Sequence, residues 1–194
     1  FYGSKVWGSN TKYRRVIWRC NEKYKGDKKC KTPHVTEDEV KEKFLEAFNS
    51  IFEYREELIT NCRLAQKSLC DCTDLDLEIN ELHREIEVVA ELSRKAIYEN
   101  AHTAIDQDKW HERNGSYLER HRKATERVDE MESLKRERQS KGLMLENFIK
   151  TLESCKEVLE EFDKRVWMSA IDIISVQPEG QLIFSFKDGT EIKV

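Results

Sequence analysis

Cys20 and Cys30 are the residues of this chain whose type points most directly to chemistry. Cysteine thiolates bind structural zinc tetrahedrally, usually as four ligands in two close pairs. Nine residues separate Cys20 from Cys30, a wider gap than the two residues of a common metal knuckle. These two thiols alone cannot complete a tetrahedral site. We therefore expect half of a four-cysteine zinc site, whose other thiolates come from elsewhere.

The other four cysteines have simpler interpretations. Their spacing is irregular, which favours reduced thiols over a disulfide framework. Cys62 and Cys155 lie in apolar helical patterns and are expected to be core residues. Cys70 and Cys72 fall at a helix junction, and they would contribute to a zinc site only if that junction folded back onto the N-terminal segment. An ordinary junction is the favoured alternative.

The N-terminal segment is strongly basic. Residues 1–32 contain ten Lys or Arg against Glu22 and Asp27, a local charge of +8 in a chain whose net charge is −4. A basic end on an acidic body predicts contact with a polyanion, and nucleic acid is the leading candidate. The expected DNA-binding residues are Lys5, Lys12, Arg14, Arg15 and Arg19. The interleaved Tyr and Trp rings either pack against sugars or form the segment's own small core.

Neither catalysis nor a membrane span is indicated. The five histidines share no metal-ligand spacing, and no H-E-x-x-H, Walker or G-x-S-x-G element occurs, so we expect no catalytic residue. No window is apolar enough for a transmembrane helix, and the first ten residues do not resemble a signal peptide. We expect a cytoplasmic protein, in a bacterial cell given the resemblance described below.

Composition and periodicity predict a mainly α protein with small β parts. Charged residues make up 37% of the chain, with only seven Gly and two Pro, which is typical of long solvated helices. Phe1–Trp7 and Lys12–Cys20 are expected to form a β hairpin, with turns at 8–10 and 25–27. Thr36, followed by Glu39, predicts a capping box at the start of a helix.

Two narrow apolar seams predict an antiparallel coiled-coil hairpin over 73–141. Reversal near residues 106–108 would place Leu75 opposite about residue 139 and Ala96 close to Tyr117. Asn114-Gly115 is the rival turn, but it would leave the seams out of step. The divisions we expect are a zinc-ribbon-like hairpin at 1–35, a body helix at 36–72, the coiled-coil arm at 73–141, a second body helix at 142–168 and a β meander at 169–194.

The tip of the arm is a candidate protein contact. Ile105 and Trp110 flank the expected reversal, where two helices cannot enclose large apolar groups. The arm carries 17 acidic and 13 basic residues, so it lacks the cationic surface that a phosphate-binding element needs. We expect another subunit to cover the tip, although a small self-packed tip is the alternative.

Taken together, these residues resemble a known family. The run "FYGSKVWGSNTKYRRVIWRCNEKYKGDKKCKTPHVTEDEVKEKFLEAFN" is similar to the zinc β-ribbon of large serine recombinases, which include integrases, invertases and transposon resolvases. "ENAHTAIDQDKW", "EEFDKRVWMSAIDIISV" and "GQLIFSFKDGTEIKV" resemble the coiled-coil and closing segments of the same proteins. In that family a first cysteine pair lies just upstream of a stretch like Phe1–Ser4, and the second pair matches Cys20 and Cys30.

The resemblance implies a region of a larger DNA-processing enzyme. The full protein would cut and rejoin the DNA of a mobile element through a phosphoserine linkage, in a catalytic domain to which none of these residues corresponds. The piece described here would bind an attachment site in duplex DNA, hold zinc in the full-length protein and associate with other recombinase subunits through the arm. Two alternatives are a coiled-coil scaffold whose basic ribbon binds protein or nucleic acid, and a zinc-ribbon subunit of another nucleic-acid enzyme.

Overall fold

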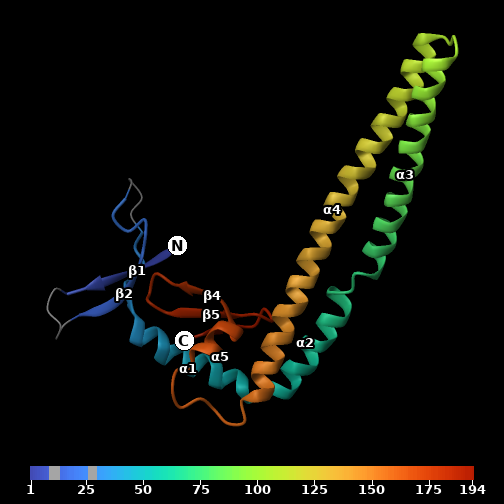
Figure 1. The fold of residues 1–194 in the computed structure, drawn as a ribbon. Coiled ribbons are helices and arrows are strands. Elements are labelled where there is room, and N and C mark those ends of the chain that lie inside the picture. Colours follow the sequence, from blue (N-terminus) through green and yellow to red (C-terminus); the bar gives the residue numbers. More distant parts are fainter. Residues whose placement is uncertain (9–13, 26–29) are drawn as a thin grey trace. The chain divides into compact units, whose positions relative to one another are not determined.

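A computed structural model describes residues 1–8, 14–25 and 30–194, and its main elements are shown in Figure 1. The described chain is mainly helical, with one three-stranded antiparallel sheet near each end, as the composition predicts. It divides into two compact units. The first comprises residues 1–65 and 143–194, and the second comprises residues 66–142. No helix in the described ranges has an apolar stretch sufficient to cross a membrane.

The N-terminal sheet is a hairpin extended by a very short third strand. β1 (Tyr2–Trp7) pairs with β2 (Arg15–Cys20), and β2 pairs with β3 (Val35–Thr36), all antiparallel. Gly8 follows β1 with a φ of 96°, a left-handed conformation that favours glycine and suits the predicted reversal. The rest of the two expected turns, residues 9–10 and 26–27, lies outside the described residues.

The first body helix begins as predicted but ends earlier. α1 (Glu37–Phe52) starts with the expected capping box: the Glu39 amide donates to the Thr36 hydroxyl, and the Thr36 amide donates to the Glu39 carboxylate. The prediction of a single helix over 36–72 is wrong, because the chain turns at Glu53–Tyr54 before α2 (Arg55–Leu69). The turn changes the direction of the chain so that α2 buries its apolar face in the core that α1 already lines.

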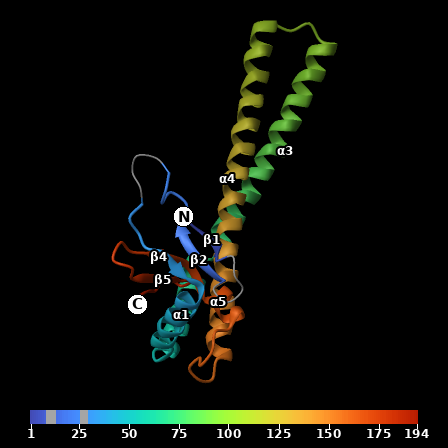
Figure 2. The same ribbon diagram turned by 90° about the vertical axis from the view of Figure 1, so that its left-hand side faces the viewer.

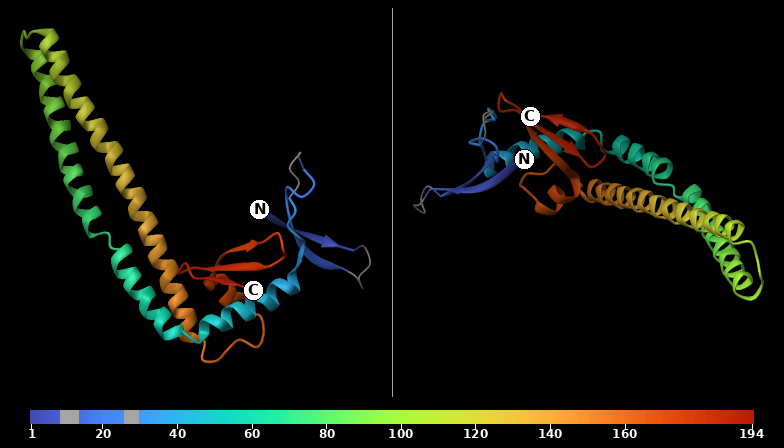
Figure 3. Two further views of the ribbon diagram at one scale, coloured as in Figure 1. Left: turned by 180° about the vertical axis from the view of Figure 1, so that it is seen from behind. Right: turned by 90° about the horizontal axis from the view of Figure 1, so that it is seen from above.

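One apolar core holds the first unit together. It contains β3, α1, α2, the end of α4 (Gln107–Ser154), α5 (Lys164–Ala170) and the C-terminal sheet. Figure 3 shows that both ends of the chain belong to this unit. The Phe44 ring lies at its centre, 5.0 Å from Trp167 and 5.8 Å from Phe162 between ring centroids. Cys62 is buried here, as predicted, and burial raises the pKa of its thiol to about 11.

The second body helix is also shorter than predicted. The apolar stripe from Leu143 onward does reach the core, but α4 ends at Ser154 and residues 155–163 are irregular. The Asn49 side chain substitutes for helical hydrogen bonds in this segment, because it donates to the Leu159 carbonyl at 3.0 Å and accepts from the Leu159 amide at 2.8 Å. Asp163 then caps α5 through the Arg165 and Val166 amides.

The C-terminal meander forms as expected. β4 (Ile171–Val176), β5 (Leu182–Phe186) and β6 (Glu191–Lys193) pair in sequence order. Alternation along β5 buries Leu182, Phe184 and Phe186 in the core. Gly180 and Gly189 occupy the two turns with φ near +94°, which explains the glycine at each reversal.

The second unit is an antiparallel helical hairpin made by α3 (Thr73–His102) and the first part of α4, and the two helices lie side by side in Figures 1 and 2. The chain reverses at 103–106, whereas Asn114-Gly115 lies inside α4, so the rival turn is excluded. The predicted register is wrong by about two turns. Leu75 clusters with Met131 rather than lying opposite residue 139, because Asp106 caps α4 through the Asp108 and Lys109 amides and starts that helix earlier.

We expect Phe148→Ala to destabilise the first unit by about 3–5 kcal/mol, because it removes a fully buried ring and leaves a cavity. Alkylation of Cys62 measures opening of the same core, since the thiol is only 3% exposed. The alkylation rate of Cys62 in Phe148→Ala should exceed the wild-type rate by about 100-fold or more. Leu143→Ala, on the same helix but at a side chain that is 66% exposed, is the control. Equal rates in the two variants would contradict the described core.

Candidate nucleic-acid interface

The register of β1 and β2 divides the hairpin into two faces. Residues directly opposite each other in an antiparallel pair point to the same side. One side, the Arg15 face, combines the pairs Trp7–Arg15, Lys5–Ile17 and Gly3–Arg19. The other side, the Trp18 face, combines Val6–Val16, Ser4–Trp18 and Tyr2–Cys20.

This division separates the residues that the sequence proposes for DNA binding. Lys5, Arg15 and Arg19 share the Arg15 face, with Lys5 and Arg15 exposed and Arg19 half-buried. Arg14 is exposed just before β2, and strand alternation carries it to the opposite side. Lys12 lies outside the described residues. The sequence could not divide the set in this way, because the division depends on which strand residues pair.

Two of these arginines lie against aromatic rings. The Arg15 guanidinium carbon is 5.0 Å from the centroid of the Trp7 ring, across the strand pair. The Arg19 guanidinium carbon is 5.2 Å from the centroid of Tyr24. Trp7 is 56% and Tyr24 64% exposed, so these rings do not form a core of the hairpin. Tyr2 differs from them: it packs against the main core and its hydroxyl donates to the Pro33 carbonyl at 2.7 Å.

Positive charge also gathers at the base of the hairpin. After β2 the chain turns, with the Lys23 amide donating to the Cys20 carbonyl at 3.2 Å. The Lys23 ammonium donates to the Thr32 carbonyl, which brings it near the segment containing His34. Burial lowers the pKa of His34, and Lys23 and Arg19 lower it further. The sequence does not single out His34, since its approach to these cations depends on how segments 20–25 and 30–34 pack together.

Cys20 and Cys30 lie together at the same base. Both are half-buried free thiols, and Cys20 lies close enough to contribute to a lowered pKa of Cys30. The Thr32 hydroxyl lies 2.9 Å from the Cys30 sulfur, and this hydrogen bond is the main cause of a lowered Cys30 pKa. Burial raises the pKa of the neighbouring Tyr2 hydroxyl, and the two thiolates raise it further. The fold therefore supplies adjacent thiols, one of them stabilised in its thiolate form, as zinc coordination requires.

The thiol pair fits half of a zinc site. A structural zinc has four protein ligands, and no group of three potential metal ligands occurs within the ranges 1–8, 14–25 and 30–194. Cys70 and Cys72 belong to the arm unit, where Cys70 packs against Gly142 and Cys72 approaches the Lys135 carbonyl. Cys155 packs against the main core, and burial raises the pKa of its thiol.

At the arm tip, Ile105 and Trp110 are both half-buried. The Trp110 indole N–H donates to the Ala96 carbonyl at 2.9 Å, so the ring is fixed against α3. The tip is thus partly packed on itself and still offers some apolar surface.

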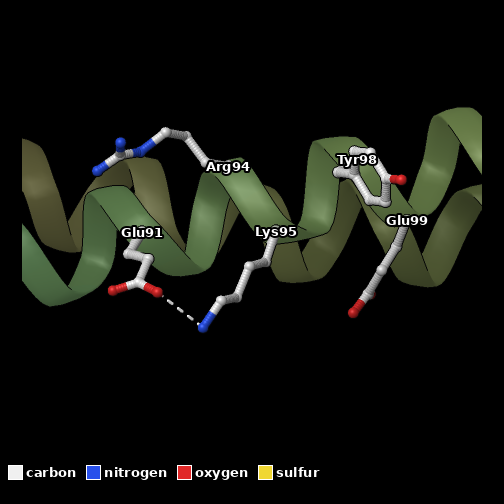
Figure 4. A pocket seen from close by; sticks show the side chains of 5 residues that line it. All are labelled: Glu91, Arg94, Lys95, Tyr98 and Glu99. Atoms are coloured by element: carbon white, nitrogen blue, oxygen red, sulfur yellow. Dashed lines mark ion pairs between the residues drawn. The ribbon is translucent and has the colours of Figure 1, made fainter.

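The rest of the arm has a mixed and internally paired charge. Arg120–Glu85 at 2.6 Å and Arg127–Glu78 at 2.8 Å join α4 to α3. Figure 4 shows a shallow depression on α3 lined by Glu91, Arg94, Lys95, Tyr98 and Glu99, in which Glu91 and Lys95 pair at 2.8 Å. Side chains of both signs on one helix face describe a solvated surface rather than a convergent binding site.

Comparison with known proteins bears on the N-terminal segment. Residues 3–49 match the family model described as the recombinase zinc beta ribbon domain. The matched residues include Cys20, Cys30, all six strand residues of the Arg15 face, and most of α1. No curated protein and no solved structure matched the chain. The match supports a recombinase zinc ribbon at this end of the chain, and hence possible zinc binding.

We expect this chain to hold zinc poorly, because two thiolates provide half of the ligands of a structural site. Elemental analysis after dialysis should find well under one zinc per chain. One tightly held zinc per chain would contradict this expectation. Paired variants would then locate it: loss in Cys70→Ala/Cys72→Ala, but not in Cys20→Ala/Cys30→Ala, would assign the metal to the arm junction.

Proposed function

We propose that this chain is the C-terminal DNA-binding and subunit-interaction region of a large serine recombinase. The observation that carries the proposal is the match of residues 3–49 to the recombinase zinc ribbon, in a segment whose hairpin presents cations to solvent. The sequence resemblance over the remaining chain supports the assignment to the large serine recombinases in particular. In the full-length enzyme, a separate catalytic domain would cut and rejoin DNA through a serine.

The hairpin is the part of the chain best suited to phosphate contact. Lys5, Arg14 and Arg15 are exposed, and each can approach a phosphate without first leaving a buried position. Neutralising phosphates releases condensed counterions, which drives binding at low salt. These residues would bind and orient the duplex.

Zinc would stabilise this hairpin in the full-length protein. Cys20 and Cys30 would hold the ion together with two further thiolates, and the bound metal would supply a structural cross-link. The hydrogen bond between Thr32 and Cys30 supports this role because it stabilises the thiolate form.

The arm is better suited to contact protein. Its basic residues include several that already pair with carboxylates across the hairpin, which reduces their attraction for phosphate. Partly exposed apolar groups at its tip would be covered by another subunit. The difference between the hairpin and the arm supports the proposal that each recombinase subunit binds DNA through its hairpin and contacts another subunit through its arm.

DNA binding by the whole chain tests the proposal. The logarithm of affinity for a labelled DNA duplex should fall linearly with the logarithm of salt concentration, with a slope of about −0.9 per phosphate contact. Arg14→Ala/Arg15→Ala should make that slope shallower by about 0.9 to 1.8.

Lys164→Ala/Arg165→Ala is the matched control, since it removes two adjacent exposed cations from α5. The control should keep the wild-type slope. A wild-type chain without salt-dependent DNA binding would refute the DNA-binding assignment and leave the coiled-coil scaffold as the better interpretation.

Ile105→Ser/Trp110→Ser in the full-length enzyme tests the arm. We expect binding to a single attachment site to stay within about two-fold of wild type, while pairing of two sites is lost, because the tip would contact protein and not DNA. A gel-shift assay that resolves single-site complexes from paired-site complexes measures both.

Val88→Ser/Leu118→Ser, at exposed apolar positions along the arm, is the control for general loss of surface hydrophobicity. Trp110→Phe separates the indole hydrogen bond to Ala96 from the apolar contact. Unaltered pairing and recombination in the tip variant would exclude a subunit contact there.

A further inference from the structure

The Arg15 face pairs each of its two arginines with an exposed aromatic ring. Trp7 and Arg15 are directly opposite each other in the strand register, with 5.0 Å between the guanidinium carbon and the ring centroid. Arg19 and Tyr24 make the equivalent contact at 5.2 Å, from the end of β2 to the turn that follows it. Two independent contacts of one kind therefore lie on the same face.

We infer that Trp7 and Tyr24 are positioning residues that hold the guanidinium groups of Arg15 and Arg19 for contact with phosphates of duplex DNA, and that the Arg15 face is the DNA-contacting side of the hairpin. The inference rests on the proposed DNA-binding function. It adds the face that engages the duplex and a role for two uncharged residues.

The physics of the contact supports this role. A guanidinium is weakly hydrated and planar, so it lies favourably over the electron-rich face of an aromatic ring. The ring occupies the face of the guanidinium plane and leaves the N–H groups at its edges available for phosphate oxygens. An exposed arginine that is already restrained loses less conformational freedom when it binds.

The geometry of the face also suits a polyanion. Arg15 and Arg19 are four residues apart on one strand, so their Cα atoms are separated by about 13 Å. Lys5 pairs with Ile17 and therefore lies between them on the neighbouring strand. Gly3, opposite Arg19, adds no side chain at that end of the row. Three cations in a row can contact several phosphates of one backbone at once.

The opposite face has a different character. Its six strand residues, those of the Trp18 face, include no cation. At one end of this face, Tyr2 packs against the main core, and Cys20 beside it belongs to the thiol pair. Val6 is 58% and Trp18 37% exposed there. Arg14 is the cation that alternation places on this side, just before β2. Electrostatic attraction for a duplex is therefore concentrated on the Arg15 face.

A double-mutant cycle on the full chain tests the inference, with a labelled random-sequence DNA duplex as the probe. Arg15→Ala should make the salt slope shallower by about 0.9, a larger change than Arg14→Ala produces by removing the same charge from the other side. Trp7→Leu should weaken binding about two- to five-fold and Trp7→Phe less, as expected for an exposed cation–π contact. Trp7→Leu/Arg15→Ala should bind no more weakly than Arg15→Ala alone.

Trp18→Leu is the matched aromatic control on the opposite face and should bind DNA like the wild type. Tyr24→Leu and Arg19→Ala form a second, independent cycle. Cys62 alkylation shows whether each variant folds, and the second cycle tests the positioning role if a Trp7 variant does not. Additive effects of Trp7→Leu and Arg15→Ala would overturn the positioning role, since a ring that stacked directly on a base would act without Arg15. Loss of affinity in Trp18→Leu or Arg14→Ala equal to that on the Arg15 face would overturn the choice of face.

The wild-type measurement separates this inference from the function on which it rests. If the wild-type chain shows no salt-dependent DNA binding, the proposed function fails and the inference fails with it. If the wild type binds with the expected salt dependence but either cycle is additive, the DNA-binding function stands and the positioning role alone is refuted.

Discussion

Burial of the aromatic cluster around Phe44 is the constraint on which the first unit depends. The rings that surround Phe44 come from α1, from the irregular segment before α5, from α5 itself and from β5. In sequence α1 is more than a hundred residues away from the other three segments, so closing the cluster fixes the topology of the unit. Val35 belongs to the same core and also pairs with Trp18, which ties the N-terminal hairpin to it. The hairpin is thereby anchored at its base, while Lys5, Trp7 and Arg15 stay exposed.

Arginine side chains make different contacts in the two units. In the arm, arginines at 113, 120 and 127 neutralise glutamates of the facing helix, and the ion pairs help to set the register of the hairpin. On the Arg15 face the arginines instead lie on aromatic rings, which restrain the side chain without cancelling its charge. The same residue type thus stabilises structure in one unit and remains available to a polyanion in the other.

Local contacts also order the thiol pair, which by itself supplies only part of a metal site. Strand pairing places Cys20 beside Tyr2, and the segment returning through Thr32 brings Cys30 to it. The hydrogen bonds around Lys23, Thr32 and Pro33 hold this return path in place. Residues 3–49 match the recombinase zinc ribbon, and the proposal that Cys20 and Cys30 are two ligands of a zinc ion rests on this arrangement.

Sequence alone determined the elements whose signals are local. The capping box at Thr36 and Glu39, the β meander with its turn glycines and the antiparallel arm all follow from short-range periodicity and backbone preference. Only the tertiary structure decided where the body helices end, how the arm is registered and which cations share a face. The break after Phe52 depends on packing into a shared core, and the irregular segment at Leu159 depends on hydrogen bonds from Asn49, far away in sequence. Such long-range contacts leave no periodic signal, because each is set by pairing between segments rather than by the pattern within one.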